Sequence, residues 1–357
     1  MQLALSLAAR GRGRTWPNPA VGCVIVKQGR IVGRGWTQPS GRPHAEVVAL
    51  AQAGDQAEGA TAYVTLEPCA HHGKTPPCAD ALVRAGIGRV ICAAGDSDER
   101  VSGRGFEILR SAGVKVEQGI LEKKARDLNK GFFAKVEKGR PMVTLKLANS
   151  FDGRIATASG ESQWITGAQA RREVHRQRSS HDAVMVGAGT ARADDPSLNV
   201  RDLGVSYQPT RIVVSRKLDI PMDGKLAKTA REIPVILCHG ADADPDRVAR
   251  WTALGAQCLS CDMTSFRQLD PASVLTALGG IGLTRVFCEG GGQLAASLLS
   301  AGLVDEIIGF TAGVVLGAEG QPSLGAMGVE QLSQAPRFEL LETRRIGGDV
   351  LHRWCAT

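Results

Sequence analysis

The stretch Glu67-Pro-Cys-Ala-His-His-Gly-Lys-Thr-Pro-Pro-Cys78 follows an apolar run and places two thiols, Cys69 and Cys78, in one short segment. Upstream, His44 and Glu46 stand two residues apart. Imidazole and thiolate groups are ligands that zinc prefers, and three protein ligands leave a fourth position open for water, as in catalytic sites. We therefore predict that His44, Cys69 and Cys78 bind zinc and that Glu46 moves protons beside it. The structural alternative is a surface histidine, an exposed acid and two buried cysteines.

The first part of the chain alternates between apolar strands and helices. We expect strands at residues 21–26, 30–34, 62–66, 89–94 and 114–117, and helices at 1–9, 44–53, 79–85, 106–112 and 121–138. Strands separated by helices predict a sheet that is covered on both faces. Gly139-Arg140-Pro141 breaks the last helix, so we place a domain boundary there, with domains at residues 1–140 and 141–357.

The second part repeats the alternation with different contents. We expect strands at residues 142–148, 183–187, 211–215, 234–238, 285–288 and 306–310, and a turn at 151–154. The segment Glu289-Gly-Gly-Gly-Gln293 joins a strand to a helix, and such glycines let the backbone approach a phosphate at a helix N-terminus. It is not the dinucleotide fingerprint G-x-G-x-x-G, and a plain glycine-rich turn is the alternative.

Composition limits the possible partners. The chain has 357 residues, 43% of them hydrophobic and 22% charged, which is typical of a globular protein. The net charge of +7 comes from scattered arginines rather than a basic block, which favours phosphorylated small molecules over nucleic acid. We see no signal peptide and no apolar run long enough for a bilayer, so we expect no membrane partner. Nine cysteines without such a signal indicate cytoplasmic thiols.

The order H-x-E, then P-C and a second cysteine is the zinc-deaminase pattern. Eight residues separate Cys69 from Cys78, and with this insert the segment closely resembles the bacterial bifunctional deaminase–reductase family of riboflavin biosynthesis. Further matches are Trp16-Pro-Asn-Pro19, Gly22-Cys-Val-Ile-Val26, Pro43-His-Ala-Glu46, Leu128-Asn-Lys-Gly-Phe132, Gly160-Glu-Ser-Gln-Trp-Ile-Thr166 and Ala193-Asp-Asp-Pro196. The resemblance covers essentially the whole chain.

The resemblance implies an α/β protein: an N-terminal cytidine-deaminase-like α/β/α sandwich and a C-terminal dihydrofolate-reductase-like α/β domain. The first domain would use zinc to deaminate 2,5-diamino-6-ribosylamino-4(3H)-pyrimidinone 5′-phosphate. The second would use NADPH to reduce the ribosyl side chain to ribityl. The implied deaminase substrate contacts are Asn18, His71 and Lys74, for which a solvated polar loop is the alternative.

Positions in the second domain also match the family's pattern. Those implied for NADPH are Ala148, Trp164, Thr190, Asp194, Ser215, Gly291, Gly292, Gln293, Leu294, Ala295, Ala296 and Ser297. Those implied for the substrate are Ser162, Arg178, Leu198, Arg201 and Glu289. The two arginines suit a phosphate through forked hydrogen bonds, although both would also be ordinary on a surface. Lys146 on the first strand of this domain would polarise the sugar oxygen or imine, or else be a solvated strand lysine.

Two other functions are compatible with parts of the sequence. A tRNA-editing deaminase with an appended binding domain would share the zinc pattern, but the insert and the absence of a basic patch oppose it. A non-catalytic zinc module would not need Glu46. We also expect a homo-oligomer through the second domain, because its late strands, from residues 306–310 onward, are apolar.

Overall fold

The structure is a computed structural model that describes residues 1–71, 76–98 and 101–357. The chain divides into two compact units, Met1–Gly139 and Arg140–Thr357, and each is described by itself. Among the described residues, no helix is long and apolar enough to cross a membrane.

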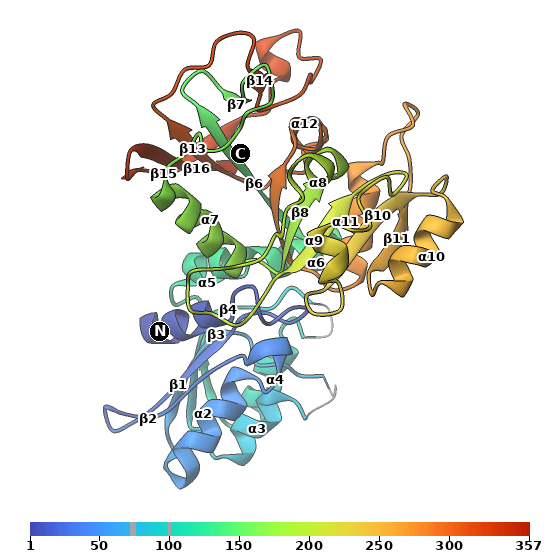
Figure 1. The fold of residues 1–357 in the computed structure, drawn as a ribbon. Helices are drawn as coiled ribbons and strands as arrows, with labels where there is room; N and C mark the ends of the chain where they lie inside the picture. The colour runs from blue at the N-terminus through green and yellow to red at the C-terminus, as the bar shows by residue number, and fades with distance from the viewer. Residues whose placement is uncertain (72–75, 99–100) are drawn as a thin grey trace. The chain divides into compact units, whose positions relative to one another are not determined.

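The first unit contains one five-stranded sheet in the order β2-β1-β3-β4-β5 (Figure 1). Its strands are β1 (Gly22–Lys27), β2 (Arg30–Trp36), β3 (Thr61–Leu66), β4 (Arg89–Ala94) and β5 (Lys115–Glu117). Its α-helices are α1 (Gln2–Ala8), α2 (Ala45–Ala53), α3 (Cys78–Arg84), α4 (Arg104–Ser111), α5 (Glu122–Leu128) and α6 (Lys130–Lys138). Strand β1 is antiparallel to β2 and β3, whereas β3, β4 and β5 are mutually parallel.

Side chains of β1 alternate between two apolar layers, as a strand covered on both faces requires. Cys23 and Ile25 pack in the core on the side of α2, whereas Val24 packs with α1. Glycines on β2 let α2 come very close, because a Cβ at Gly33 or Gly35 would lie 2.2 or 2.1 Å from a backbone carbonyl oxygen of that helix. The expected α/β/α sandwich is therefore confirmed.

The long helix predicted at residues 121–138 is wrong, because the chain forms α5 and α6 with Asn129 between them. The Asn129 side chain is buried and forms two hydrogen bonds with Ala20: its Oδ1 accepts from the backbone N–H at 2.9 Å, and its Nδ2 donates to the carbonyl at 3.0 Å. This long-range tie interrupts the helix, and helical periodicity alone does not reveal it.

The second unit contains a nine-stranded sheet in the order β11-β10-β9-β8-β12-β6-β13-β16-β15. Its strands are β6 (Met142–Ser150), β8 (Ala183–Gly187), β9 (Thr210–Val214), β10 (Val235–Gly240), β11 (Gln257–Cys261), β12 (Arg285–Gly290), β13 (Glu306–Ala312), β15 (Phe338–Ile346) and β16 (Asp349–Ala356). Strand β16 is antiparallel to both of its neighbours, β13 and β15, whereas the neighbours from β11 to β13 in the order run parallel. A separate ribbon pairs β7 (Arg154–Ala156) with β14 (Gln321–Pro322).

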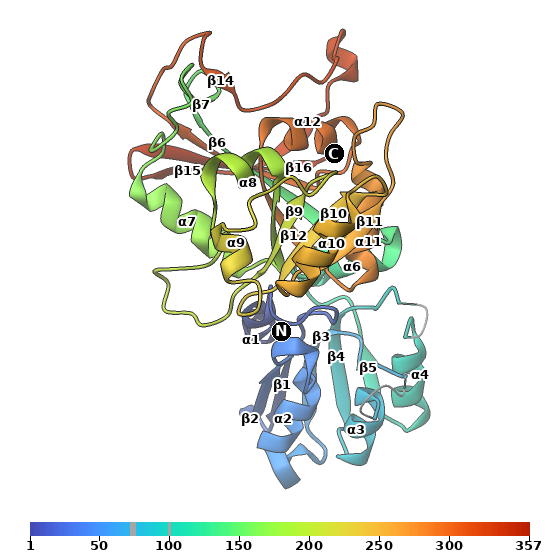
Figure 2. The same cartoon turned by 45° about the vertical axis from the view of Figure 1, so that its right-hand side comes forward.

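Helices of the second unit lie on opposite faces because the chain changes direction along the sheet. From β6 it steps through β8, β9 and β10 to β11, and right-handed crossovers keep their connections on one face. It then returns to β12 and β13, which places the returning helices on the other face. The first group is α7 (Ala168–Ser179), α8 (Ala188–Asp194), α9 (Lys225–Lys228) and α10 (Pro245–Ala253); the second is α11 (Pro271–Gly280) and α12 (Gly292–Ser300) (Figure 2).

Candidate functional site

Three candidate metal ligands meet at the ends of three elements in the first unit. His44 is the residue before α2, Cys69 lies three residues after the end of β3, and Cys78 is the first residue of α3. The Nδ1 atom of His44 lies 3.2 Å from the Cys78 sulfur and 3.6 Å from the Cys69 sulfur. All three ligand atoms lie within 4.8 Å of one another. One imidazole and two thiols at this spacing fit a zinc ion.

Hydrogen bonding shifts the pKa values of the Cys69 and Cys78 thiols in opposite directions. The hydrogen bond from Cys78, helped by His44, lowers the pKa of Cys69 to about 4. The same bond and burial raise the pKa of Cys78. The backbone N–H of Cys78 also donates to the Cys69 sulfur at 3.3 Å. A lowered pKa favours the thiolate form of Cys69, which is the form that binds zinc.

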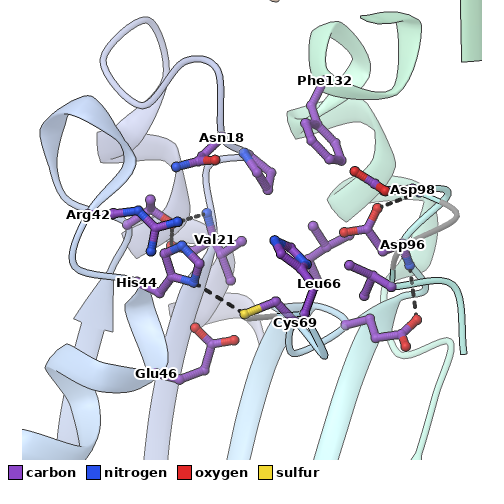
Figure 3. Close-up of a pocket in the computed structure, with 15 residues that line it drawn as sticks. Asn18, Val21, Arg42, His44, Glu46, Leu66, Cys69, Asp96, Asp98 and Phe132 are labelled. Atoms are coloured by element: carbon purple, nitrogen blue, oxygen red, sulfur yellow. Dashed lines mark hydrogen bonds between the residues drawn. The ribbon is translucent and has the colours of Figure 1, made fainter. Parts of the chain in front are cut away.

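Glu46 lies in the first turn of α2 and is 3% exposed. Burial and the nearby Cys69 thiolate raise its pKa to about 7. A carboxyl group with this pKa exchanges protons readily near neutral pH, as a general acid and base must. Figure 3 shows the Glu46 side chain below His44 and Cys69, on the same side of the pocket.

A pocket opens over these residues, and it contains two of the expected substrate contacts. Asn18 lines it and donates from Nδ2 to the Gly41 carbonyl at 3.1 Å. His71 also lines it, and its buried Nδ1 has no hydrogen-bond partner among the residues that the structure describes. Lys74 lies outside the described residues.

Other lining residues were missed by the sequence reasoning. Arg42 is beside His44, whereas Asp96 and Asp98 lie across the pocket, near Phe132 (Figure 3). The two aspartates follow β4, which is parallel to β3, so the carboxyl ends of both strands face the same pocket. Polar residues directly after a predicted strand were the signal that would have found them.

In the second unit, three residues expected at the substrate form one buried charge cluster. Arg178 makes a two-fold ion pair with Glu289, with Nη2 donating to Oε2 at 2.9 Å and Nε donating to Oε1. Both side chains are about one-tenth exposed. Lys146 lies on β6, next to β12, and interacts electrostatically with Glu289.

The charges in this cluster set one another's protonation. Burial opposes ionisation of Glu289, but the Arg178 charge and its hydrogen bonds outweigh it and lower the pKa. Burial lowers the pKa of Lys146, and the Glu289 carboxylate partly offsets this. His175, which the sequence reasoning missed, is 8% exposed beside the cluster, and burial and Arg178 lower its pKa.

The glycine-rich segment at the carboxyl end of β12 fits a bound phosphate. Gly291 has φ of +88° and stands before α12 with no side chain capping the helix. A Cβ there would lie 3.0 Å from the Thr190 hydroxyl oxygen, so glycine leaves a cradle between α12 and α8. Thr190 donates to the Gly290 carbonyl at 3.4 Å. Uncapped helix N–H groups and an open backbone suit the phosphates of NADPH.

Other residues expected at the cofactor differ in their accessibility. Ala148 is half-buried near the end of β6, Gly292, Leu294 and Ser297 are half-buried on α12, and Gln293 is exposed. Ala295 and Ala296 are buried inside α12. Ser215 is 1% exposed and donates to Asp219 at 3.1 Å, so its hydroxyl already has a partner. Trp164 is 64% exposed, with the Arg171 guanidinium 4.5 Å from its ring centre.

The remaining expected residues of the second unit also differ in exposure. Asp194 ends α8, exposed, within electrostatic reach of Lys146. Leu198 is buried with φ of +50°, and Ser162 is half-buried. The Arg201 side chain is 56% exposed, and its backbone N–H donates to His175 at 3.4 Å.

Two family models and several curated proteins match the chain. Residues 1–94 match the family model for the cytidine and deoxycytidylate deaminase zinc-binding region, and residues 141–352 match the RibD C-terminal domain. The chain is 42% identical to the riboflavin biosynthesis protein RibD of Escherichia coli, covering 98% of this chain and 96% of that one. It is 40% identical to the RibD of Aquifex aeolicus, at the same coverage.

Solved structures are also similar to the chain over its whole length. Acinetobacter baumannii RibD is 40% identical with a TM-score of 0.88, over 100% of this chain and 97% of that one. A diaminohydroxyphosphoribosylaminopyrimidine deaminase/5-amino-6-(5-phosphoribosylamino)uracil reductase from Thermotoga maritima is 33% identical with a TM-score of 0.86, at the same coverage.

Proposed function

The chain belongs to the RibD family and is a bifunctional deaminase and reductase of riboflavin biosynthesis, and we propose from this how its residues divide the two reactions. Residues 1–140 deaminate the phosphoribosylated diaminopyrimidine named above, and residues 141–357 reduce the ribosyl side chain of the product. The partners of the chain are these small molecules rather than nucleic acid or a membrane.

His44, Cys69 and Cys78 hold the zinc ion of the deaminase. When bound, zinc acts as a Lewis acid that lowers the pKa of water to about 7. Glu46 accepts the proton of the attacking water and returns protons to the ring nitrogen and to the departing ammonia. Asn18 and His71 orient the pyrimidine and its side chain, and Lys74 supplies a cation.

In the reductase, the residues from Gly291 to Ser297 bind NADPH phosphate, and Thr190 and Ala148 shape the adjoining cradle. NADPH supplies the hydride, so the protein has to orient the two reactants. Lys146 polarises the sugar oxygen or imine. Arg201, which is the more exposed arginine, binds the substrate phosphate, and Arg178 is held by Glu289 in a largely buried ion pair.

Trp164, Asp194 and Ser215 complete the cofactor contacts, and Ser162 and Leu198 complete those to the substrate. Because the Ser215 hydroxyl is bonded to Asp219, we assign its contact to the backbone around it.

The convergence of His44, Cys69 and Cys78 carries this proposal, since three separate elements bring their ligand atoms within 4.8 Å. The test is an assay of ammonia release and NADPH loss on the purified zinc-loaded chain. We expect ammonia from the diaminopyrimidine alone, and NADPH oxidation only once the deaminated product is present.

Two results would contradict it. Ammonia release without NADPH oxidation would show that the second unit is not the proposed reductase. A chain that binds zinc but releases no ammonia would be a non-catalytic zinc module. His44→Ala serves as the control, because it should lose both the metal and ammonia release while it still oxidises NADPH with the deaminated product.

We also propose a cytoplasmic homo-oligomer that associates through the second unit. Strand β15 is an edge of the sheet, and apolar side chains of Leu340, Leu341 and Val350 on β15 and β16 are 47%, 49% and 45% exposed. Exposed apolar groups beside an open strand edge favour association. Light scattering should give a multiple of the 37.6 kDa chain mass, and Leu341→Asp should lower it. A monomer mass for the unchanged chain would contradict this.

A further inference from the structure

Glu67 is a buried acid that neither reaction uses. It is 4% exposed and stands two residues before Cys69, at the end of β3. Its carboxylate accepts three backbone N–H groups: Oε1 accepts from Gly105 at 3.0 Å, and Oε2 accepts from Gly103 at 3.1 Å and from Asp96 at 3.3 Å. A carboxylate buried this deeply is retained only when such donors satisfy it.

These bonds replace the side-chain cap that helix α4 lacks within the described ranges, 1–71, 76–98 and 101–357. Gly103, the residue before the helix, has φ of +80° and no side chain with which to cap it. Glu67 therefore supplies the acceptor from another part of the chain, and its negative charge lies at the positive end of the helix. A Cβ at Gly105 would lie 2.0 Å from the Pro68 carbonyl oxygen, so the first turn of α4 rests directly on the segment that leads to Cys69.

The same carboxylate also determines where the pocket aspartates lie. Asp96 is bound through its backbone, and its Oδ1 accepts from the Asp98 N–H at 2.9 Å. Val101 donates its N–H to the Asp98 carbonyl at 2.8 Å, and Arg104 donates to the Val101 carbonyl at 2.6 Å. Asp96, Asp98 and Val101 line the pocket, and Figure 3 shows the two aspartates across it from His44. One buried group thus joins the metal-ligand segment to the far wall.

We infer that Glu67 is a positioning residue for substrate binding in the deaminase, which holds the wall formed by Asp96, Asp98 and Val101 at a constant distance from the metal ligands. This inference rests on the deaminase site proposed above. Displacement of this wall should weaken binding of the diaminopyrimidine. It should leave His44, Cys69, Cys78 and Glu46 in place. The expected signature is a rise in KM rather than a fall in kcat.

The test compares Glu67→Gln with Glu107→Gln in the full, zinc-loaded chain. Glutamine at 67 replaces one accepting oxygen with an N–H donor, so at least one backbone bond is lost. We expect the KM for the diaminopyrimidine to rise about tenfold, kcat to change less than threefold, and zinc content to stay unchanged. Exchange of the Gly103 and Gly105 amide hydrogens should become faster. Glu107→Gln, which removes a charge from an exposed position in the same first helical turn, should change none of these.

A second variant tests the geometry without altering Glu67. Gly105→Ala must push α4 away from Pro68 and should reproduce the rise in KM with zinc retained. NADPH oxidation with the deaminated product reports on folding of the rest of the chain in every variant. A Glu67→Gln chain with unchanged KM, or one that loses zinc and kcat together, would overturn the inference. If the unchanged chain itself releases no ammonia, the proposed function fails instead.

Discussion

The two sites of this chain differ in the distance along the sequence over which they are assembled. The proposed deaminase site takes its metal ligands and its acid from residues between His44 and Cys78, and each contributes a chemically distinctive side chain. The proposed reductase site draws on residues from Lys146 to Ser297, and much of its cofactor cradle is backbone. The first site depends on which side chains are present, whereas the second depends on how strand ends are brought together.

The substitution with the largest expected effect on this comparison is Glu46→Gln. The substitution keeps the size of the side chain but removes the proton acceptor, so ammonia release should fall on the order of 10³-fold. Zinc content should be unchanged, and NADPH oxidation with the deaminated product should proceed as before. Normal deamination by this variant would show that Glu46 is not the proton carrier.

The next test is Arg178→Ala in the reductase. It would leave the Glu289 carboxylate buried without its partner, which costs about 3–5 kcal/mol. The free energy of unfolding of the second unit should fall by that amount in a denaturant titration, and NADPH oxidation should be lost. Adding Glu289→Gln should restore part of the stability. Equal ammonia release in both variants and the parent is the control, and its loss would mean that the units do not act separately.

Lowering the pH should change the contributions of Glu289 and Glu46 to stability in opposite directions. The pKa of Glu289 lies below its ordinary value of 4.5, so its stabilising contribution is present above pH 4.5 and is lost as the pH falls through the lowered pKa. The pKa of Glu46 is raised to about 7, so in zinc-free protein its contribution falls as the pH rises from 4.5 to about 7. The free energy of unfolding should be measured against pH. Its slope below pH 4.5 should flatten in Glu289→Gln, and its slope between pH 4.5 and about 7 should flatten in Glu46→Gln. Slopes of the same sign would contradict the assignment.

The smallest expected effect is that of Asn129→Ala. It leaves the N–H and carbonyl of Ala20 without their buried partner, at a cost of about 1–3 kcal/mol in unfolding free energy. Denaturant unfolding of the first unit measures this cost. Lys130→Ala, a change at a partly exposed neighbouring position, should cost less. If both cost the same, helix propensity rather than the tie to Ala20 explains the break.

The zinc ligands were predictable because each is a residue type that few other environments require, and all three ligands lie near element ends that hydrophobic periodicity already marks. The pocket aspartates, Asp96 and Asp98, were missed because surface loops after strands commonly contain acids. The role of Glu67 was equally hard to predict, since its partners are backbone N–H groups 29 to 38 residues further along the chain. No residue type in the sequence signals that kind of contact.

Sequence by itself determined the fold class of each half, the family and which residues to propose as metal ligands, because periodicity and rare side-chain combinations are local properties. Tertiary structure decided that Asn129 interrupts a helix, that Ser215 donates to Asp219, that Arg178 and Glu289 form an ion pair, and that Glu67 accepts from the backbone of Gly103. Each of these depends on which buried polar groups become neighbours. Burial makes such pairing necessary, but only the packing of distant strands selects the partners.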